Sequence, residues 1–212
     1  AGPFFNFGSE QDAKDATLVI AGADQGGLGL PDRDYYLKDD AKMKAIRDAY
    51  VAHVEKMLTL AGEPAAQAKT DAADILTLET ALAKASMDKV DRRDPYKVYH
   101  RVDRAGLAKI AKGFPWDAYF GELGFPNVQA VSVNDPAYFT GIDALMSAES
   151  PRVWQHYLAW QLAHAKASVL PKAFVNEAFA LRHELVGQKE LEPRWKRCVR
   201  AVDGGLGELL AQ

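Results

Sequence analysis

The sequence is poor in cysteine and has no long apolar run. Its 212 residues include one cysteine, Cys198, and a single thiol cannot form a disulfide within the chain, so packing must stabilise the fold. No apolar run approaches the roughly 18 residues that cross a bilayer. The first residues, AGPFFNFGSEQD, lack the basic start and apolar centre of a signal peptide. We therefore expect no membrane span, in a chain that is either cytosolic or has lost a targeting segment.

The excess of negative over positive charge is also small: the net charge is −3. So small a charge gives no overall attraction to nucleic-acid phosphates or anionic lipid. Arg194, Lys196, Arg197 and Arg200 form a local basic patch, but no aromatic side chains interleave on its exposed side, as sites for single-stranded nucleic acid require. We expect a solvated face or an intramolecular partner for acidic side chains, and no nucleic-acid binding.

The first 30 residues predict a β-hairpin followed by an irregular loop. FFNF and TLVIAG are short apolar runs separated by GSEQDAKDA, a pattern typical of two strands joined by a polar turn. The stretch that follows, DQGGLGLPDRDYYL at 24–37, holds three glycines and a proline. These residues interrupt regular structure, so we expect a loop before the first long helix.

Helical periodicity dominates the rest of the chain. Apolar stripes predict helices over 43–61, 64–85, 116–123, 136–146, 154–165, 174–185 and 195–209, with a short extended run at 127–134. The expected fold class is mainly α: a multi-helix orthogonal bundle with a small N-terminal β-hairpin, in a single domain over 1–212. Its core is expected to contain the four tryptophans, Trp116, Trp154, Trp160 and Trp195.

The zinc-protease motif H-E-x-x-H begins with a His-Glu pair on a helix. This sequence has such a pair at His183 and Glu184. The fourth position after His183 is Gly187, which offers no ligand atom and is typical of a helix end. The remaining histidines, His53, His100, His156 and His164, show no ligand spacing. We therefore expect an exposed helix face at His183, and no metal-ligating, cofactor-binding or catalytic residue in the chain.

Other candidate sites have structural interpretations. Gly26, Gly27 and Gly29 lack the G-x-G-x-x-G spacing and the βαβ setting of a phosphate loop, which favours a structural turn. Cys198 lies on the apolar stripe of its helix, which favours a buried, unreactive thiol. Two aspartates, Asp32 and Asp34, flank Arg33. Their pKa values should be lowered by that charge, so ion pairing and capping are favoured over proton transfer.

A resemblance to a known family rests on three stretches in order: DQGGLGLPDRDYYL at 24–37, DRRDPYKVYHRV at 91–102 and LVGQKELEPRWKRCVRAVDGGLGELLAQ at 185–212. The segments VSVNDPAYF and VWQHYLAWQLAHA fit as well. Together they resemble the neprilysin family of zinc metallopeptidases, which includes the endothelin-converting enzymes and the bacterial oligopeptidase O. The resemblance covers nearly the whole chain.

The resemblance implies that this chain is only the helical N-terminal region of such a peptidase. In the family this region forms a lobe that faces the zinc-bearing catalytic domain across a closed cavity. The zinc motif comes after the point that corresponds to Gln212, so zinc is expected in that catalytic domain and no cofactor in this chain. The implied partners are the zinc-bearing catalytic half and peptide substrates. The resemblance leaves open a homodimer of the isolated lobe.

The sequence departs from the family in ways that bear on its source. Family members usually have a further segment before the hairpin, so the chain resembles an internal fragment. In vertebrate secreted members the equivalent of Cys198 pairs with a cysteine shortly after the D-Y-Y triplet, but here Leu37, Lys38 and Asp39 follow Tyr36. A bacterial-type hydrolase, periplasmic or secreted, is implied, with the cytoplasm left open. The alternative is a stand-alone helical module that binds a peptide or a protein.

Overall fold

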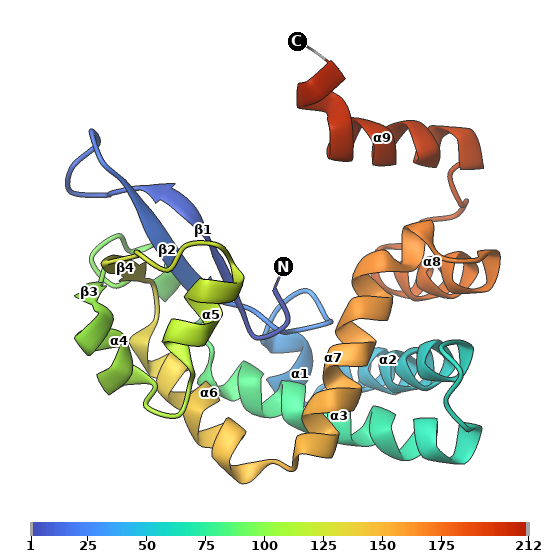
Figure 1. Ribbon diagram of the computed structural model, residues 1–212. Helices are drawn as coiled ribbons and strands as arrows, with labels where there is room; N and C mark the ends of the chain where they lie inside the picture. The colour runs from blue at the N-terminus through green and yellow to red at the C-terminus, as the bar shows by residue number, and fades with distance from the viewer. Residues whose placement is uncertain (1, 211–212) are drawn as a thin grey trace.

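A computed structural model describes residues 2–210 and confirms the mainly helical fold with β-structure near the N-terminus (Figure 1). The long helices are α2 (Ala41–Leu60), α3 (Ala65–Ala85), α6 (Pro136–Ala148), α7 (Pro151–Lys166), α8 (Lys172–Val186) and α9 (Arg194–Leu210). The short helices are α1 (Asp34–Leu37), α4 (Arg104–Ile110) and α5 (Trp116–Glu122). Single 3₁₀ turns span Asp91–Arg93 and Ala167–Val169.

Local sequence signals set the ends of these helices. The side chain of Asp40 accepts a hydrogen bond from the Met43 amide at 2.9 Å and so caps α2. Asp135 caps α6 in the same way, with Pro136 at the first helical position. Gly187 ends α8 in the left-handed conformation, with φ 67°, where glycine carries no steric penalty. The predicted end of this helix at Gly187 is therefore confirmed.

The predicted two-stranded hairpin forms part of a four-stranded sheet. Its strands are β1 (Phe5–Gln11), β2 (Val19–Gln25), β3 (Arg101–Asp103) and β4 (Ala130–Val133), in the order β1-β2-β4-β3. The hairpin of β1 and β2 is confirmed, and the extended run near residue 130 adds to it as a parallel partner of β2. Strand β3 has only three residues, too few for an alternating pattern to reveal it in the sequence.

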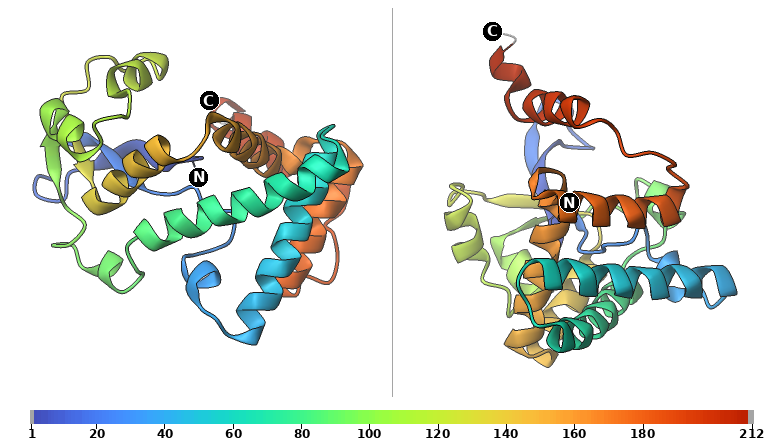
Figure 2. Two further views of the ribbon diagram at one scale, coloured as in Figure 1. Left: turned by 90° about the horizontal axis from the view of Figure 1, so that it is seen from below. Right: turned by 90° about the vertical axis from the view of Figure 1, so that its right-hand side faces the viewer.

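The sheet and the long helices occupy different parts of the molecule. Figure 2 shows the sheet with α4 and α5 at one end and the helices α2 and α8 at the other, while α3 and α6 connect the two. Helix α2 packs against α3, α7 and α8, and α3 packs against α6 and α7. Helix α7 crosses α2 and α3 in Figure 1 and reaches the loop that follows β2.

The tryptophans divide between the core and the surface. Trp160 has no exposed surface, Trp116 is buried, and Trp154 is partly buried against the core. Trp195 is 65% exposed and Cys198 is exposed, so the predictions that both are buried are wrong. The reason is the position of α9, which stands apart from the other helices (Figures 1 and 2). The apolar stripe of α9 exists as predicted, but no described residue covers it.

The contrast between two tryptophans gives a first test. Trp160→Ala should lower the free energy of unfolding by about 3–5 kcal/mol, because it leaves a large cavity in the core. Trp195→Ala should change it by less than about 1 kcal/mol, because the side chain is mostly solvated. Urea unfolding of the three proteins followed by circular dichroism measures both changes. Equal losses in the two variants would contradict the burial described above.

Candidate functional site

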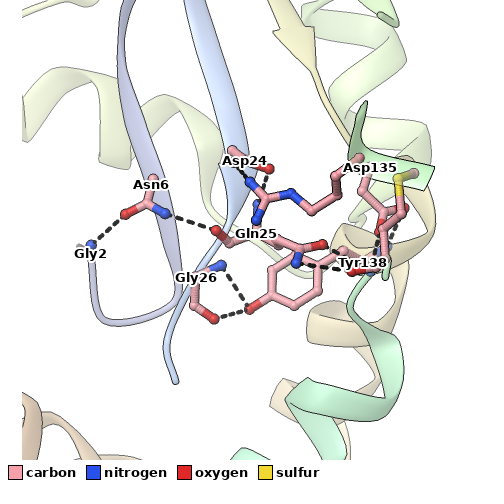
Figure 3. Close-up of polar contacts among 9 residues, drawn as sticks. Gly2, Asn6, Asp24, Gln25, Gly26, Asp135 and Tyr138 are labelled. Carbon is pink, nitrogen blue, oxygen red and sulfur yellow. Dashed lines mark hydrogen bonds and ion pairs between the residues drawn. The ribbon is translucent and has the colours of Figure 1, made fainter. Parts of the chain in front are cut away.

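The glycine loop, residues 26–31, joins β2 to α1 and is held by buried tyrosine hydroxyls. Tyr138 Oη donates to the carbonyl of Gly26 at 2.7 Å (Figure 3), and Tyr157 Oη donates to that of Gly27 at 2.7 Å. The amide of Leu30 donates to Tyr36 Oη at 2.9 Å. The loop carries out the role of a structural turn, as its glycine spacing predicts.

Two of its glycines are required by geometry. Gly27 has φ 75°, in the left-handed region that side chains disfavour. At Gly29 an added Cβ would lie 2.0 Å from Tyr50 Oη, so only a residue without a side chain lets the loop approach this tyrosine. The sequence DQGGLGLP is thus explained by contact with the core, without a bound phosphate.

Below the loop a carboxylate with no exposed surface, that of Glu79, joins several helices. Its Oε2 accepts from the hydroxyls of Tyr36 and Tyr50, both at 2.6 Å. Its Oε1 accepts from Trp160 Nε1 at 3.3 Å and from Gln161 Nε2 at 3.2 Å. We call these five residues the Glu79 cluster. It links α3, α1, α2 and α7 through one side chain.

Burial governs the protonation of this cluster. Burial raises the pKa of Glu79 to about 7, and the donors from Tyr36, Tyr50, Gly29 and Trp160 oppose that rise. Burial and the nearby carboxylate raise the pKa of both tyrosines, which therefore stay protonated and able to donate. Because Glu79 is out of reach of solvent and of any ligand, its perturbed pKa is a property of the core and not a catalytic device.

A polar cavity of about 220 Å³ lies beside the glycine loop, lined by residues of the 24–34 and 86–92 segments. Here the first two motifs of the sequence meet. Asp24 pairs with Arg92, and the Gln25 side chain exchanges two hydrogen bonds with the backbone of Met87, at 2.8 and 3.2 Å (Figure 3). The Met87 amide also donates to Asp135 Oδ2 at 3.1 Å. Two of the charged side chains that line this cavity, Arg92 and Lys89, are held in ion pairs with Asp24 and Asp34.

The aspartates of the loop serve as ion-pair and capping groups, with partners other than the predicted one. Asp32 Oδ1 accepts from the Asp34 amide at 2.8 Å. Asp34 pairs with Lys38 at 2.9 Å and with Lys89 at 3.3 Å, and these lysines lower its pKa. Arg33, the predicted partner, makes neither pair. A carboxylate held ionised by two cations is poorly suited to transfer a proton near neutral pH.

A second cavity, of about 590 Å³, lies between the glycine loop, the end of α7, α8 and the segment before α9. Most of its lining is apolar, and His164, Arg182 and Arg197 are its titratable or charged members. The Nδ1 of His164 is buried without a hydrogen-bond partner, and burial lowers the pKa of His164 to about 4. Nearby His53 Nδ1 lies 2.8 Å from Glu177 Oε1, and burial lowers its pKa too. Both rings are therefore neutral at physiological pH.

The structure places the His-Glu pair where the sequence predicts it. His183 and Glu184 are exposed on α8, and His183 Nδ1 faces the Gln188 carbonyl at 2.9 Å. The helix ends at Gly187, so the second histidine of a zinc-protease motif has no counterpart. The donor set required by a catalytic zinc is thus not supplied by α8.

The basic patch on α9 has intramolecular partners. Arg200 pairs with Glu192 at 2.8 Å, and Arg197 Nε donates to the Glu192 carbonyl at 3.1 Å. Lys196 Nζ lies 5.4 Å from the centre of the Trp195 ring. These contacts match the expectation of a solvated face with acidic partners.

The structure also contains a cluster of potential metal ligands that was not predicted from the sequence. Glu63, Asp71 and His156 each offer a ligand atom, and these atoms lie within 4.8 Å of one another. The residues come from three separate segments, so no spacing in the sequence could join them.

The Glu79 cluster predicts a specific pH dependence. The pKa of the Glu79 carboxyl is ordinarily 4.5 and is about 7 in the folded state. At a pH between these two values, the folded state holds a proton that the unfolded state has lost. The contribution of Glu79 to stability is therefore fully present below about pH 4.5 and is lost as the pH rises to about 7. The stability of the wild type relative to Glu79→Gln should fall by about 3 kcal/mol across this range.

Chemical denaturation at several pH values measures this difference. Glu184→Gln, at an exposed position, serves as the control and should differ little from the wild type at every pH. A stability difference between wild type and Glu79→Gln that does not change with pH would contradict the buried, proton-binding carboxylate.

Comparisons with known proteins agree with this architecture. Human endothelin-converting enzyme 1 is 29% identical over 97% of this chain, which covers 27% of that enzyme. The zinc metalloprotease Zmp1 of Mycobacterium tuberculosis is 32% identical in its open state, with a TM-score of 0.91 over 98% of this chain and 32% of that one. Its complex with an inhibitor gives the same identity and TM-score.

This chain thus spans about a third or less of the length of the relatives it matches. Among the residues that the structure describes, none of the helices combines the length and the hydrophobicity of a bilayer-spanning segment. The model of Peptidase family M13 matches residues 1–212. The chain therefore belongs to Peptidase family M13, the neprilysin-type metallopeptidases, and represents the N-terminal region of that family.

Proposed function

We propose that this region is a helical lobe that closes over the zinc-bearing catalytic region of a neprilysin-like endopeptidase. In this role it encloses the cavity, restricts substrates to short peptides and performs no catalysis alone. The main support is the uncovered apolar stripe of α9, together with the relatives named as zinc metalloprotease, of which this chain spans a third or less. A periplasmic or secreted location is part of the proposal, and it rests on the family resemblance.

The apolar stripe of α9 is an exposed hydrophobic face of the kind that usually packs against another protein surface. It consists of side chains that are 48–69% exposed at a spacing of three and four residues: Trp195, Val199, Val202, Leu206 and Leu209. Such spacing places them on one face of the helix. A contiguous apolar face on an otherwise polar helix marks an interaction site. We assign it to the catalytic region, because the relatives are much longer than this chain.

The chemistry of the described residues supports a non-catalytic role. In the polar cavity beside the glycine loop, Arg92 and Lys89 are held in ion pairs, and α8 lacks a second zinc-ligating histidine. No described cavity brings together an acid, a base and a nucleophile. The catalytic zinc is therefore assigned to the part of the relatives that this chain does not match.

A lobe of this kind selects substrates by size. A closed cavity admits short flexible peptides and excludes folded proteins, because the chain must pass inside before the chemistry begins. A rigid lobe is needed for that purpose, and the Glu79 cluster links four helices of the lobe.

A stand-alone module that binds a peptide or a protein is the second candidate. The largely apolar cavity of about 590 Å³ favours it, since ligand sites are concave and mostly apolar. The two proposals differ in whether the stripe of α9 is covered by the same protein.

The purified chain should show no zinc-dependent hydrolysis of a fluorogenic peptide. Its zinc content and cleavage rate can be measured together, with an authentic M13 peptidase as the positive control. Zinc-dependent cleavage by this chain, retained after repurification and abolished by a chelator, would refute the proposal.

A substitution on α9 tests the covered surface. Val199→Asp together with Val202→Asp should leave the melting temperature of the isolated lobe nearly unchanged, because both side chains are exposed. In the full-length peptidase the same pair should lower the melting temperature by several degrees, because it places two charges in an apolar interface. Glu208→Gln, also exposed on α9, is the matched control. No effect of the aspartates on the full-length protein would favour the stand-alone module.

A further inference from the structure

A second candidate for chemistry lies at the turn between α2 and α3, far along the chain from the His-Glu pair. Glu63 follows the left-handed Gly62 at this turn, Asp71 lies on α3, and His156 lies on α7. Asp71 is only 2% exposed, and the side chains of Glu63 and His156 are 12% and 25% exposed. We call these three residues the His156 cluster.

All three donor atoms lie within 4.8 Å of one another, and two of their separations match those around a small metal ion. His156 Nδ1 lies 3.2 Å from Glu63 Oε1 and 3.4 Å from Asp71 Oδ2. Zinc bonds to nitrogen and carboxylate oxygen are about 2.0–2.2 Å long, and a tetrahedral arrangement then places neighbouring donors about 3.3–3.5 Å apart. The observed separations agree with adjacent corners of such a tetrahedron.

The contacts of His156 with the two acids are ion pairs only when the imidazole is protonated. Glu63 Oε1 is enclosed by protein yet has no hydrogen-bond partner among the described residues, although His156 Nδ1 lies close by. Buried carboxylate oxygens are normally paired, and one without a partner needs another explanation. A cation between the two carboxylates and the imidazole satisfies Glu63 Oε1 directly.

The Asp71 carboxylate is held in place by neighbouring side chains, as metal-ligating carboxylates usually are. Its Oδ1 pairs with Arg152, while Gln67 Nε2 donates to Oδ2 at 2.9 Å. Metal-ligating carboxylates are typically fixed by hydrogen bonds of this kind, which orient them before the ion binds. Oδ2 can still accept a second interaction on the side that faces His156.

A divalent cation between Glu63 and Asp71 would offset the repulsion between their two carboxylates. Imidazole with two carboxylates suits zinc and the neighbouring transition metals, whereas calcium and magnesium favour oxygen-only sites.

We propose that Glu63 Oε1, Asp71 Oδ2 and His156 Nδ1 form a structural site for a divalent transition metal of the zinc class. Solvent completes the coordination, since the imidazole is partly exposed. The ion cross-links the α2–α3 turn to α7, and it stabilises the lobe without taking part in peptide cleavage. This site is independent of the proposed function, because it uses only residues of the described chain.

Binding of zinc and cobalt to the chelator-treated chain tests the proposal. Zinc should raise the melting temperature by several degrees, since an ion that binds only the folded state stabilises it. Cobalt should give the visible absorption of a tetrahedral nitrogen–oxygen site at one equivalent. Glu63→Gln removes a charged ligand while preserving side-chain size, and should abolish both signals. His156→Gln should do the same.

Two controls separate this site from weak binding elsewhere. His183→Ala and Cys198→Ser remove exposed metal-binding groups and should leave both signals as in the wild type. The proposal is overturned if the wild type shows no zinc-dependent shift. It is also overturned if Glu63→Gln and His156→Gln, folded by circular dichroism, bind cobalt as the wild type does.

Discussion

The carboxylate of Glu79 is the constraint on which the helical half of this lobe depends. A carboxyl group without exposed surface is costly to bury unless its oxygens are fully hydrogen bonded. Its donors come from helices α1, α2 and α7, while Glu79 itself belongs to α3. These helices must reach their final positions together for the donors to meet one carboxylate. The cluster thereby favours a single packing arrangement among those that an apolar core alone would permit.

The same cluster positions the glycine loop. The Tyr36 hydroxyl donates a hydrogen bond to Glu79 and accepts one from the Leu30 amide. The side-chain amide of Gln161 donates to both Glu79 and the Gly27 carbonyl. The loop must then run close to Tyr50, which explains glycine at position 29. A stretch of sequence that superficially resembles a phosphate loop is in fact shaped by contact with a buried acid. Its polar neighbours line the small cavity where the 24–34 and 86–92 segments meet.

Much of this fold could be predicted from sequence, because local signals decide helix ends. Gly187 marks a helix end that the structure confirms, and Asp40 and Asp135 cap helices whose apolar stripes begin within a few residues of them. The N-terminal hairpin follows from its apolar runs and polar turn. Strand β3 and the short helices α1 and α4 were missed, since elements of three to seven residues carry little periodic pattern.

The errors have a common physical origin. An apolar stripe indicates that a helix face packs against another surface, but it does not identify that surface. For this reason Trp195 and Cys198 were predicted to lie in the core, although α9 is not part of it. Glu79 did leave a signal: it lies between Leu78 and Leu82, on the apolar stripe of α3. The His156 cluster left none, because tertiary packing alone unites its three segments.

The claim that Glu79 holds the glycine loop can be measured directly by hydrogen exchange. Comparing Glu79→Leu with the wild type, we expect faster exchange of the amides between residues 26 and 37, while those of the distant helix α5 change much less. Glu184→Leu, at an exposed position, should leave both segments as in the wild type. Unchanged protection of the loop amides in a folded Glu79→Leu protein would contradict the account.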